Sequence, residues 1–284
     1  MSGVPAAPGK PPAPERARAP LGVRAYFGAS AAWNRAAALL QAVYEGAWLG
    51  VLRREDLHAI DQRFYDHNPA YHDEAHNLRG LFPWEAEALE AFGGCRRILV
   101  IGAGGGREVL ALARLGYEVE GYECNPALVA FADDFLPRQG CAARVRFLPR
   151  DEVPAVGEPF DGIVIGWSAY TLIPGRAHRI DLLGRLRPLA RPGGLLLLSF
   201  FTRGGEGPRF RVSAGVANGI RAVLRRERAE RGDALAPNFV HYFVAEEIAA
   251  ELREAGWEPR RFTPHGPGAR DSGWALATAP AVVR

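Results

Sequence analysis

The pattern of apolar positions divides the chain into two regions. From about residue 96 onward, short apolar runs alternate with amphipathic segments, as is typical of strands alternating with helices. A short Pro/Gly-containing loop separates the last two runs, which favours an antiparallel hairpin at the edge of a mostly parallel sheet. The seven predicted strands are 98–101, 117–122, 145–148, 160–165, 195–200, 257–263 and 274–278.

The region before residue 95 has the periodicity of helices. Two further helices are predicted at 54–64 and 84–92, and Gly93-Gly94 ends the last one. We expect 21–94 to form a helical cap, and we expect Trp33, Tyr44 and Trp48 to pack in the core, because an apolar stripe usually packs. The first helix, with Ser30 as its expected N-cap, carries this stripe at Trp33, Ala37, Leu40, Tyr44, Ala47 and Val51.

Composition narrows the cellular setting. Residues 1–20 are rich in Pro and Ala and are expected to form a disordered tail, without the apolar segment of a secretory signal. No apolar run approaches the roughly 20 residues that span a bilayer. The chain has 3 cysteines, an odd number without metal-ligand spacing. We therefore expect a soluble cytoplasmic protein that has no membrane partner.

The stretch 98–123 is the most informative part of the sequence. A buried strand, a glycine turn, a helix and a second strand follow one another, and the second strand ends at a carboxylate. Gly102, Gly104 and Gly106 form a G-x-G-x-G pattern, whereas the dinucleotide pattern needs a small residue at the position of Arg107. A glycine turn without that third small residue suits S-adenosylmethionine, which has no pyrophosphate and needs bare backbone. The spacing favours a methyl donor over a hydride carrier.

Further signals follow in an order that resembles the class I S-adenosylmethionine-dependent methyltransferases. They are an acidic residue ending the second strand, Asp151 after the third, Asp161 opening the fourth and Pro192-Gly193-Gly194 before the fifth. The resemblance covers about two-thirds of the chain, from residue 96 onward. It implies an α/β fold: a Rossmann-like, seven-stranded, mostly parallel sheet with a C-terminal antiparallel hairpin. It also implies a methyltransferase domain at 95–284, with an insertion at 202–240.

The resemblance implies roles for individual residues. Glu123 matches the carboxylate that accepts hydrogen bonds from the donor ribose, about 20 residues after the first glycine; the alternative is a solvent-facing strand end. Asp151 matches the acceptor for the adenine amino group, and the alternative is a loop Asp or a helix cap. The expected cofactor contacts are Gly102, Ala103, Gly104, Gly106, Glu123, Cys124, Asp151, Glu152, Gly166 and Trp167.

Two positions leave the contacts to the methionyl part of the donor open. Many family members have an acidic residue where this chain has Val100. That carboxylate helps to organise the amino end of the donor, and its absence affects these contacts rather than the fold. Arg107 either pairs with the donor carboxylate or stands at a solvated helix start.

The acceptor side is less defined by sequence. Methyl transfer requires mainly orientation, and a base is needed only when the nucleophile carries a proton. The stretch 65–83 is crowded with His, Asn and Tyr and includes His67. It could form a pocket with a histidine base, a metal site or ordinary packing; we favour the pocket and predict no metal. The candidate catalytic residues are His72, His76, Tyr65 and Tyr170.

These features predict a methyltransferase that moves a methyl group from S-adenosylmethionine to an oxygen or nitrogen of a small molecule, such as a specialised metabolite or peptide. The alternatives are a methyltransferase acting on RNA or protein and a dinucleotide-dependent oxidoreductase. The basic run 221–231 is expected to form a solvated helix of mixed charge, and the net charge of +3 does not favour a nucleic-acid partner. The oligomeric state does not follow from the sequence.

Overall fold

The computed structural model describes residues 20–204, 207–264 and 272–280. The predicted tail at 1–20 falls outside these residues except for Pro20. Among the described residues, no helix combines the length and the apolar character needed to cross a membrane.

Every predicted strand is present within a few residues of its expected bounds. Long apolar runs such as 98–101 are buried on both faces of the sheet, which is why they were recognisable. The strands are β1 (Arg97–Ile101), β2 (Glu118–Glu123), β3 (Arg144–Phe147), β4 (Phe160–Ile165), β5 (Ala190–Thr202), β6 (Asp233–Leu235), β7 (Phe239–Phe243), β8 (Glu258–Pro264) and β9 (Ser272–Thr278).

The helices account for most of the remaining described chain. Asn125 caps α6, since its side chain accepts hydrogen bonds from the Ala127 and Leu128 amides. The α-helices are α1 (Leu21–Val51), α2 (Arg54–His67), α3 (Glu74–Asn77), α4 (Pro83–Leu89), α5 (Arg107–Arg114), α6 (Pro126–Arg138), α7 (Arg176–Leu186), α8 (Pro208–Val223) and α9 (Ala245–Glu254). Short 3₁₀ helices are η1 (Pro69–His72), η2 (Glu90–Phe92), η3 (Ala169–Leu172) and η4 (Arg187–Leu189).

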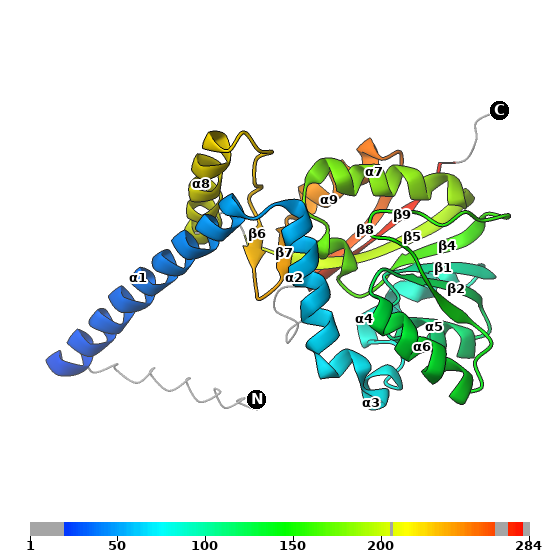
Figure 1. The fold of residues 1–284 in the computed structure, drawn as a ribbon. Coiled ribbons are helices and arrows are strands. Elements are labelled where there is room, and N and C mark those ends of the chain that lie inside the picture. Colours follow the sequence, from blue (N-terminus) through cyan, green and yellow to red (C-terminus); the bar gives the residue numbers. More distant parts are fainter. Residues whose placement is uncertain (1–19, 205–206, 265–271, 281–284) are drawn as a thin grey trace, which may run out of the picture.

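The sheet runs in the order β3-β2-β1-β4-β5, with all of these strands parallel. β9 continues it as an antiparallel neighbour of β5, and β8 pairs antiparallel with β9, so the predicted C-terminal hairpin is confirmed. Helices cover both faces (Figure 1): α4, α5 and α6 pack on one side, and α7 and α9 pack on the other. The mixed α/β, Rossmann-like architecture is therefore confirmed.

The insertion between β5 and α9 differs from its prediction. It contains α8 and a β6–β7 hairpin, and β7 joins the end of β5 in parallel, so the described sheet has nine strands rather than seven. The helix of the insertion lies at 208–223, before most of the basic run, so the prediction of a helix over 221–231 is wrong. The two added strands are 3 and 5 residues long and follow a basic, polar segment that interrupts the strand–helix alternation.

The N-terminal helices differ from one another in how they contact the sheet. α2 lies across the carboxyl ends of the strands, whereas α1 extends away from the sheet with α8 beside its C-terminal half (Figure 1). α1 begins at Leu21, so Ser30 lies inside it and does not cap it. Trp33 and Tyr44 are 70% and 64% exposed, and Trp48 is also exposed, so the prediction that they pack in the core is wrong.

Candidate donor-binding site

The loop between β1 and α5 brings bare backbone to the carboxyl edge of the sheet. Gly102 and Gly104 have φ values of +70° and +53°, in the left-handed region that favours glycine. A Cβ atom built on Gly104 would meet nothing within 4 Å, so this residue faces open space. A Cβ on Gly166 would lie 2.3 Å from the Gly102 carbonyl oxygen. The loop after β4 can therefore approach the loop after β1 this closely only because residue 166 is glycine.

Glu123, the last residue of β2, is the carboxylate nearest to this loop. Its Oε2 accepts a hydrogen bond from the Gly104 amide at 2.8 Å, and its Oε1 accepts one from the Asn125 amide at 2.8 Å. The residue is 8% exposed, which rules out the alternative of a solvent-facing strand end. Because each carboxylate oxygen has two acceptor positions, the group keeps capacity for a ligand diol.

A pocket opens between the glycine loop, Glu123 and α2. Its empty space is about 920 Å³, which includes solvent at the open mouth. Both apolar side chains and polar groups line it. The lining residues are Asp61, Tyr65, Tyr71, Ile101, Gly102, Gly104, Tyr122, Glu123, Cys124, Asn125, Leu128, Leu148, Pro149, Arg150, Asp151, Glu152, Ile165, Trp167, Ala169, Leu172, Ile173 and Leu182.

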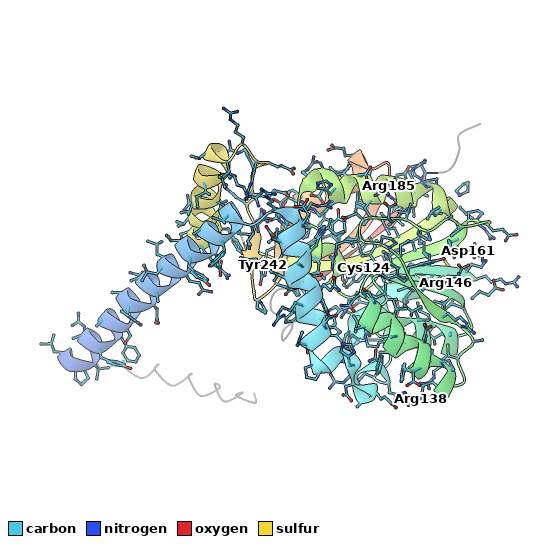
Figure 2. All side chains as sticks on the ribbon, viewed as in Figure 1. Cys124, Arg138, Arg146, Asp161, Arg185 and Tyr242 are labelled. Atoms are coloured by element: carbon cyan, nitrogen blue, oxygen red, sulfur yellow. The ribbon has the colours of Figure 1, made fainter. Side chains whose placement is uncertain are left out.

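The structure tests whether such a pocket suits an adenosine-containing donor. Leu128, Leu148 and Ile173 supply an apolar wall for a flat base. Cys124 lies in the middle of the molecule beside α2 (Figure 2), and burial raises the pKa of its thiol to about 12. The neutral thiol adds no charge next to Glu123. The open space at Gly104, the carboxylate and the apolar wall together fit S-adenosylmethionine.

Helix α2 is fastened over this pocket by polar contacts at the strand ends. Asp61 accepts hydrogen bonds from Asn238 at 2.7 Å and from Arg150. The carboxylate of Asp151, which has a φ of +65°, pairs with Arg54 at 2.8 Å. Burial raises the pKa of the Asp61 carboxyl, although Arg150 and Asn238 oppose the shift. These contacts hold helix α2 at the carboxyl edge of the sheet, beside the glycine loop.

Arg107 does neither of the two things considered from the sequence. Its guanidinium is 3% exposed and donates to both Glu85 oxygens at 2.6 Å and to Glu108 at 2.5 Å. It also lies 4.1 Å from the centre of the Phe82 ring. Burial alone would lower the pKa of Arg107, but the two carboxylates raise it overall. Arg107 therefore ties α4 to the start of α5 and does not face the pocket.

The predicted cofactor contacts divide into two groups by position. Gly106 is the N-cap of α5, Ala103 is 1% exposed and Gly166 packs against the Gly102 carbonyl, so these three support the loop behind the lining. The pocket is lined by the other predicted residues, namely Gly102, Gly104, Glu123, Cys124, Asp151, Glu152 and Trp167.

Three of the four predicted catalytic residues lie close together, but only Tyr65 lines the pocket. Tyr65 lines the pocket, and its ring lies 4.8 Å from that of Tyr71, which also lines it. His72 Nε2 is 3.1 Å from the Tyr65 carbonyl oxygen, and the His76 ring packs on Tyr71, so both lie behind the lining. Burial, with smaller contributions from nearby arginines, lowers the pKa of His76.

Tyr170 lies in a separate buried network below the pocket. It is 0% exposed, and its hydroxyl donates to Glu251 at 2.6 Å. Arg179 donates to the same carboxylate at 2.6 Å and to Glu230 at 2.9 Å. This network joins η3, α7 and α9, so the structure does not support the prediction that Tyr170 acts in catalysis.

One group in the described residues has the composition of a metal site. The ligand atoms of Glu230, Asp233 and His241 lie within 4.8 Å of one another. The Arg179 guanidinium already donates to Glu230, and His241 Nδ1 is 2.7 Å from Asp233. The guanidinium would repel a bound cation, so we do not assign a metal to this group.

Sequence reasoning missed the polar residues that α2 and the β3 loop bring to the pocket. Asp61 and Arg150 line it, yet neither belongs to a recognised motif. One signal was present: Leu57, Asp61 and Tyr65 are spaced four residues apart and share a helix face, so a carboxylate interrupts an otherwise apolar or aromatic stripe.

Comparisons with known proteins agree with this geometry. No family model matches the chain. The chain is 28% identical over 186 residues to a ubiquinone biosynthesis O-methyltransferase of Roseobacter denitrificans, covering 64% of this chain and 67% of that protein. It is 33% identical over 107 residues to the protein of the same name from Cereibacter sphaeroides, covering 38% of this chain and 42% of that protein.

Solved structures show the same fold. A methyltransferase of Methanosarcina mazei, described as S-adenosylmethionine-dependent, aligns with a TM-score of 0.56 at 20% identity over 71% of this chain and 99% of its own. The 1,6-didemethyltoxoflavin N1-methyltransferase of Burkholderia thailandensis aligns with a TM-score of 0.55 at 22% identity over 81% and 92%. The chain therefore has the fold of the class I S-adenosylmethionine-dependent methyltransferases, and its sequence is similar to those of bacterial O-methyltransferases.

Proposed function

We propose that this enzyme transfers the methyl group of S-adenosylmethionine to an oxygen or nitrogen atom of a small molecule. The observation that carries the proposal is the Glu123 carboxylate, which is held 2.8 Å from the Gly104 amide beside open space at the carboxyl edge of the sheet. This is the edge at which open α/β sheets bind their ligands.

The residues of the donor site have distinct parts in the proposal. The backbone at Gly102 and Gly104 lies against the donor, and Glu123 accepts hydrogen bonds from the ribose hydroxyls. Asp151 and Glu152 lie beside the adenine, next to the apolar wall at Leu148. The bound donor supplies an electrophilic methyl group, so the protein has mainly to orient the acceptor atom.

The acceptor side is proposed to include the aromatic residues of the pocket. Tyr65 and Tyr71 lie on and after α2, and Trp167 follows β4. Burial raises the pKa of both phenols, that of Tyr65 well above its usual value, so both hydroxyls are neutral hydrogen-bond donors. The name shared by the bacterial relatives, O-methyltransferase, favours an oxygen acceptor.

The contacts made by the basic run 221–231 favour a small-molecule acceptor over RNA or protein. Arg221 donates to the Leu49 carbonyl oxygen at 2.8 Å, and Arg226 donates to that of Val51. These guanidiniums therefore fasten α8 and the following loop to α1. We propose a cytoplasmic location, which suits the free thiols of Cys95, Cys124 and Cys141.

Isothermal calorimetry with S-adenosylmethionine and with NADH tests the proposal. The wild-type protein should bind the first and not the second. Glu123→Ala should weaken donor binding about 10- to 100-fold, because hydrogen bonds to a charged group contribute about 1.5–3 kcal/mol. Glu118→Ala is the matched control: it lies at the other end of β2 in a surface pair with Arg96 at 2.7 Å.

The control should bind the donor as the wild type does. If Glu123→Ala folds and binds S-adenosylmethionine as tightly as the wild type, the assignment of the ribose site is wrong. Binding of NADH in place of the methyl donor would contradict the function itself.

A further inference from the structure

Helix α1 has two faces, and α8 covers one of them. A Cβ atom on Gly46 would lie 2.5 Å from the Ser213 carbonyl oxygen, and one on Gly50 would lie 2.7 Å from Ile220, so the two helices pack in close contact. Ala42 and Leu49 are buried on the same face. α8 has 16 residues and α1 has 31, so α8 accompanies only the C-terminal half of α1 (Figure 1).

The opposite face carries an apolar seven-residue repeat, interrupted only by Ser30, which we call the outer stripe. Because each residue turns the helix by about 100°, the stripe lies roughly opposite the face that contacts α8. Its two interleaved series are separated by alternating steps of three and four residues, which is the pattern of a coiled-coil seam. The outer stripe consists of Val23, Ser30, Ala37, Tyr44 and Val51 with Tyr26, Trp33, Leu40 and Ala47.

The described residues of the chain leave much of this stripe open to solvent. Tyr26, Trp33, Leu40 and Tyr44 are 68%, 70%, 69% and 64% exposed. With the flanking Trp48, covering the aromatic side chains alone would remove roughly 500 Å² per chain from water. Adding Val23, Leu40 and Val51 of the outer stripe brings the area near the roughly 800 Å² per partner of a stable interface.

We propose that the outer stripe is the dimerisation surface of this enzyme, where α1 of a second copy packs along α1. Large side chains alternate with the small residues Ser30, Ala37 and Ala47. The large side chains of each helix can therefore pack into the spaces beside the small residues of the other. Two α1–α8 pairs joined in this way form a four-helix arrangement.

The charge of α1 favours a second copy over a lipid surface. Between residues 21 and 44 the helix carries only two charged side chains, Arg24 and Arg35, and both lie outside the outer stripe and its flanks. A helix that lies on anionic lipid has a strongly charged face rich in Lys and Arg. The uncharged flanks instead allow two copies to approach closely without repulsion.

Light scattering coupled to size-exclusion chromatography of the full chain, over a dilution series, tests the proposal. The wild type should have about twice its chain mass of 30.9 kDa. The double variant Trp33→Glu with Leu40→Glu places charges in the stripe and should have the mass of a single chain. The matched control Ala31→Glu with Ala38→Glu places the same charges at exposed positions on the far side of α1 and should stay dimeric.

Donor binding should be equal in the wild type and both double variants, because the pocket lies at the carboxyl edge of the sheet. A wild type that is monomeric at every concentration overturns the proposal, as does equal dissociation of the two double variants. Flotation with phosphatidylcholine–phosphatidylglycerol vesicles supplies a further outcome. A monomeric wild type that floats, while the stripe variant does not, would assign the stripe to lipid instead.

Discussion

Helices α1 and α2 are both amphipathic, yet the structure uses them in opposite ways. The face of α2 that carries Leu57, Asp61 and Tyr65 turns inward over the donor pocket. The outer stripe of α1 has more apolar side chains, but its aromatic side chains are exposed. Periodicity identifies which residues share a face, whereas the chain's topology decides whether anything covers that face.

The largest effect on stability is expected at the buried ion pairs of Arg107 with Glu85 and Glu108. Arg107→Met would leave Glu85 and Glu108 buried without their cation, so unfolding should become about 3–5 kcal/mol easier. Urea unfolding measures this. Arg114→Met, an exposed position on the same helix, should change stability by less than about 0.5 kcal/mol. Equal losses of stability in the two variants would show that the buried ion pairs stabilise the fold no more than an exposed arginine does.

Helix α1 contains two glycines whose substitution by alanine should change stability in opposite directions. Gly46→Ala would force a methyl group against the α8 backbone and should cost about 1–3 kcal/mol. Gly28→Ala meets no atom within 4 Å and should stabilise the helix by about 0.5–1 kcal/mol. Thermal unfolding distinguishes them, and neither should alter donor affinity. Stabilisation by Gly46→Ala would disprove the close α1–α8 packing.

A second pair of glycines sharpens the definition of the donor site. Gly104→Ala and Gly116→Ala both place a side chain at positive φ without a neighbour, so each should cost about 1–2 kcal/mol of stability. Only Gly104 lines the pocket, so only Gly104→Ala should weaken donor binding, by about tenfold or about 1.4 kcal/mol. If calorimetry finds equal donor affinity for both variants, the donor does not bind against this loop.

The smallest effect expected is a pH dependence of stability at His241. Burial would lower its pKa, but the hydrogen bond to Asp233 and the nearby Glu247 carboxylate raise it above its usual value. The protonated form therefore stabilises the fold below pH 6.5, and that contribution is lost as the pH rises through the folded-state pKa. Unfolding at several pH values should show this loss in the wild type and not in His241→Asn or Asp233→Asn. An unchanged pH profile in both variants would contradict it.

The centre of the sheet was predictable because β1, β4 and β5 contain local, continuous apolar runs. The glycine loop and Glu123 were predictable for a related reason, since one strand–turn–helix–strand unit fixes their spacing. Neither conclusion required knowledge of a distant partner.

Other parts depend on contacts between residues far apart in the chain. Arg107 pairs with Glu85, and Asp61 pairs with Arg150 and Asn238, across separations that no local pattern encodes. Tyr170 follows β4 as family members would have it, but its side chain turns to Glu251 on α9. The β6–β7 hairpin was missed because its strands are short and interrupt a basic, glycine-containing segment.

Diffraction from crystals grown with S-adenosylhomocysteine tests the central claim most directly. We predict density for the nucleoside between the glycine loop and Leu148, with both ribose hydroxyls within hydrogen-bonding distance of the Glu123 carboxylate. A pocket filled by the protein's own side chains, or a nucleoside bound elsewhere with Glu123 still facing only Gly104 and Asn125, would contradict it.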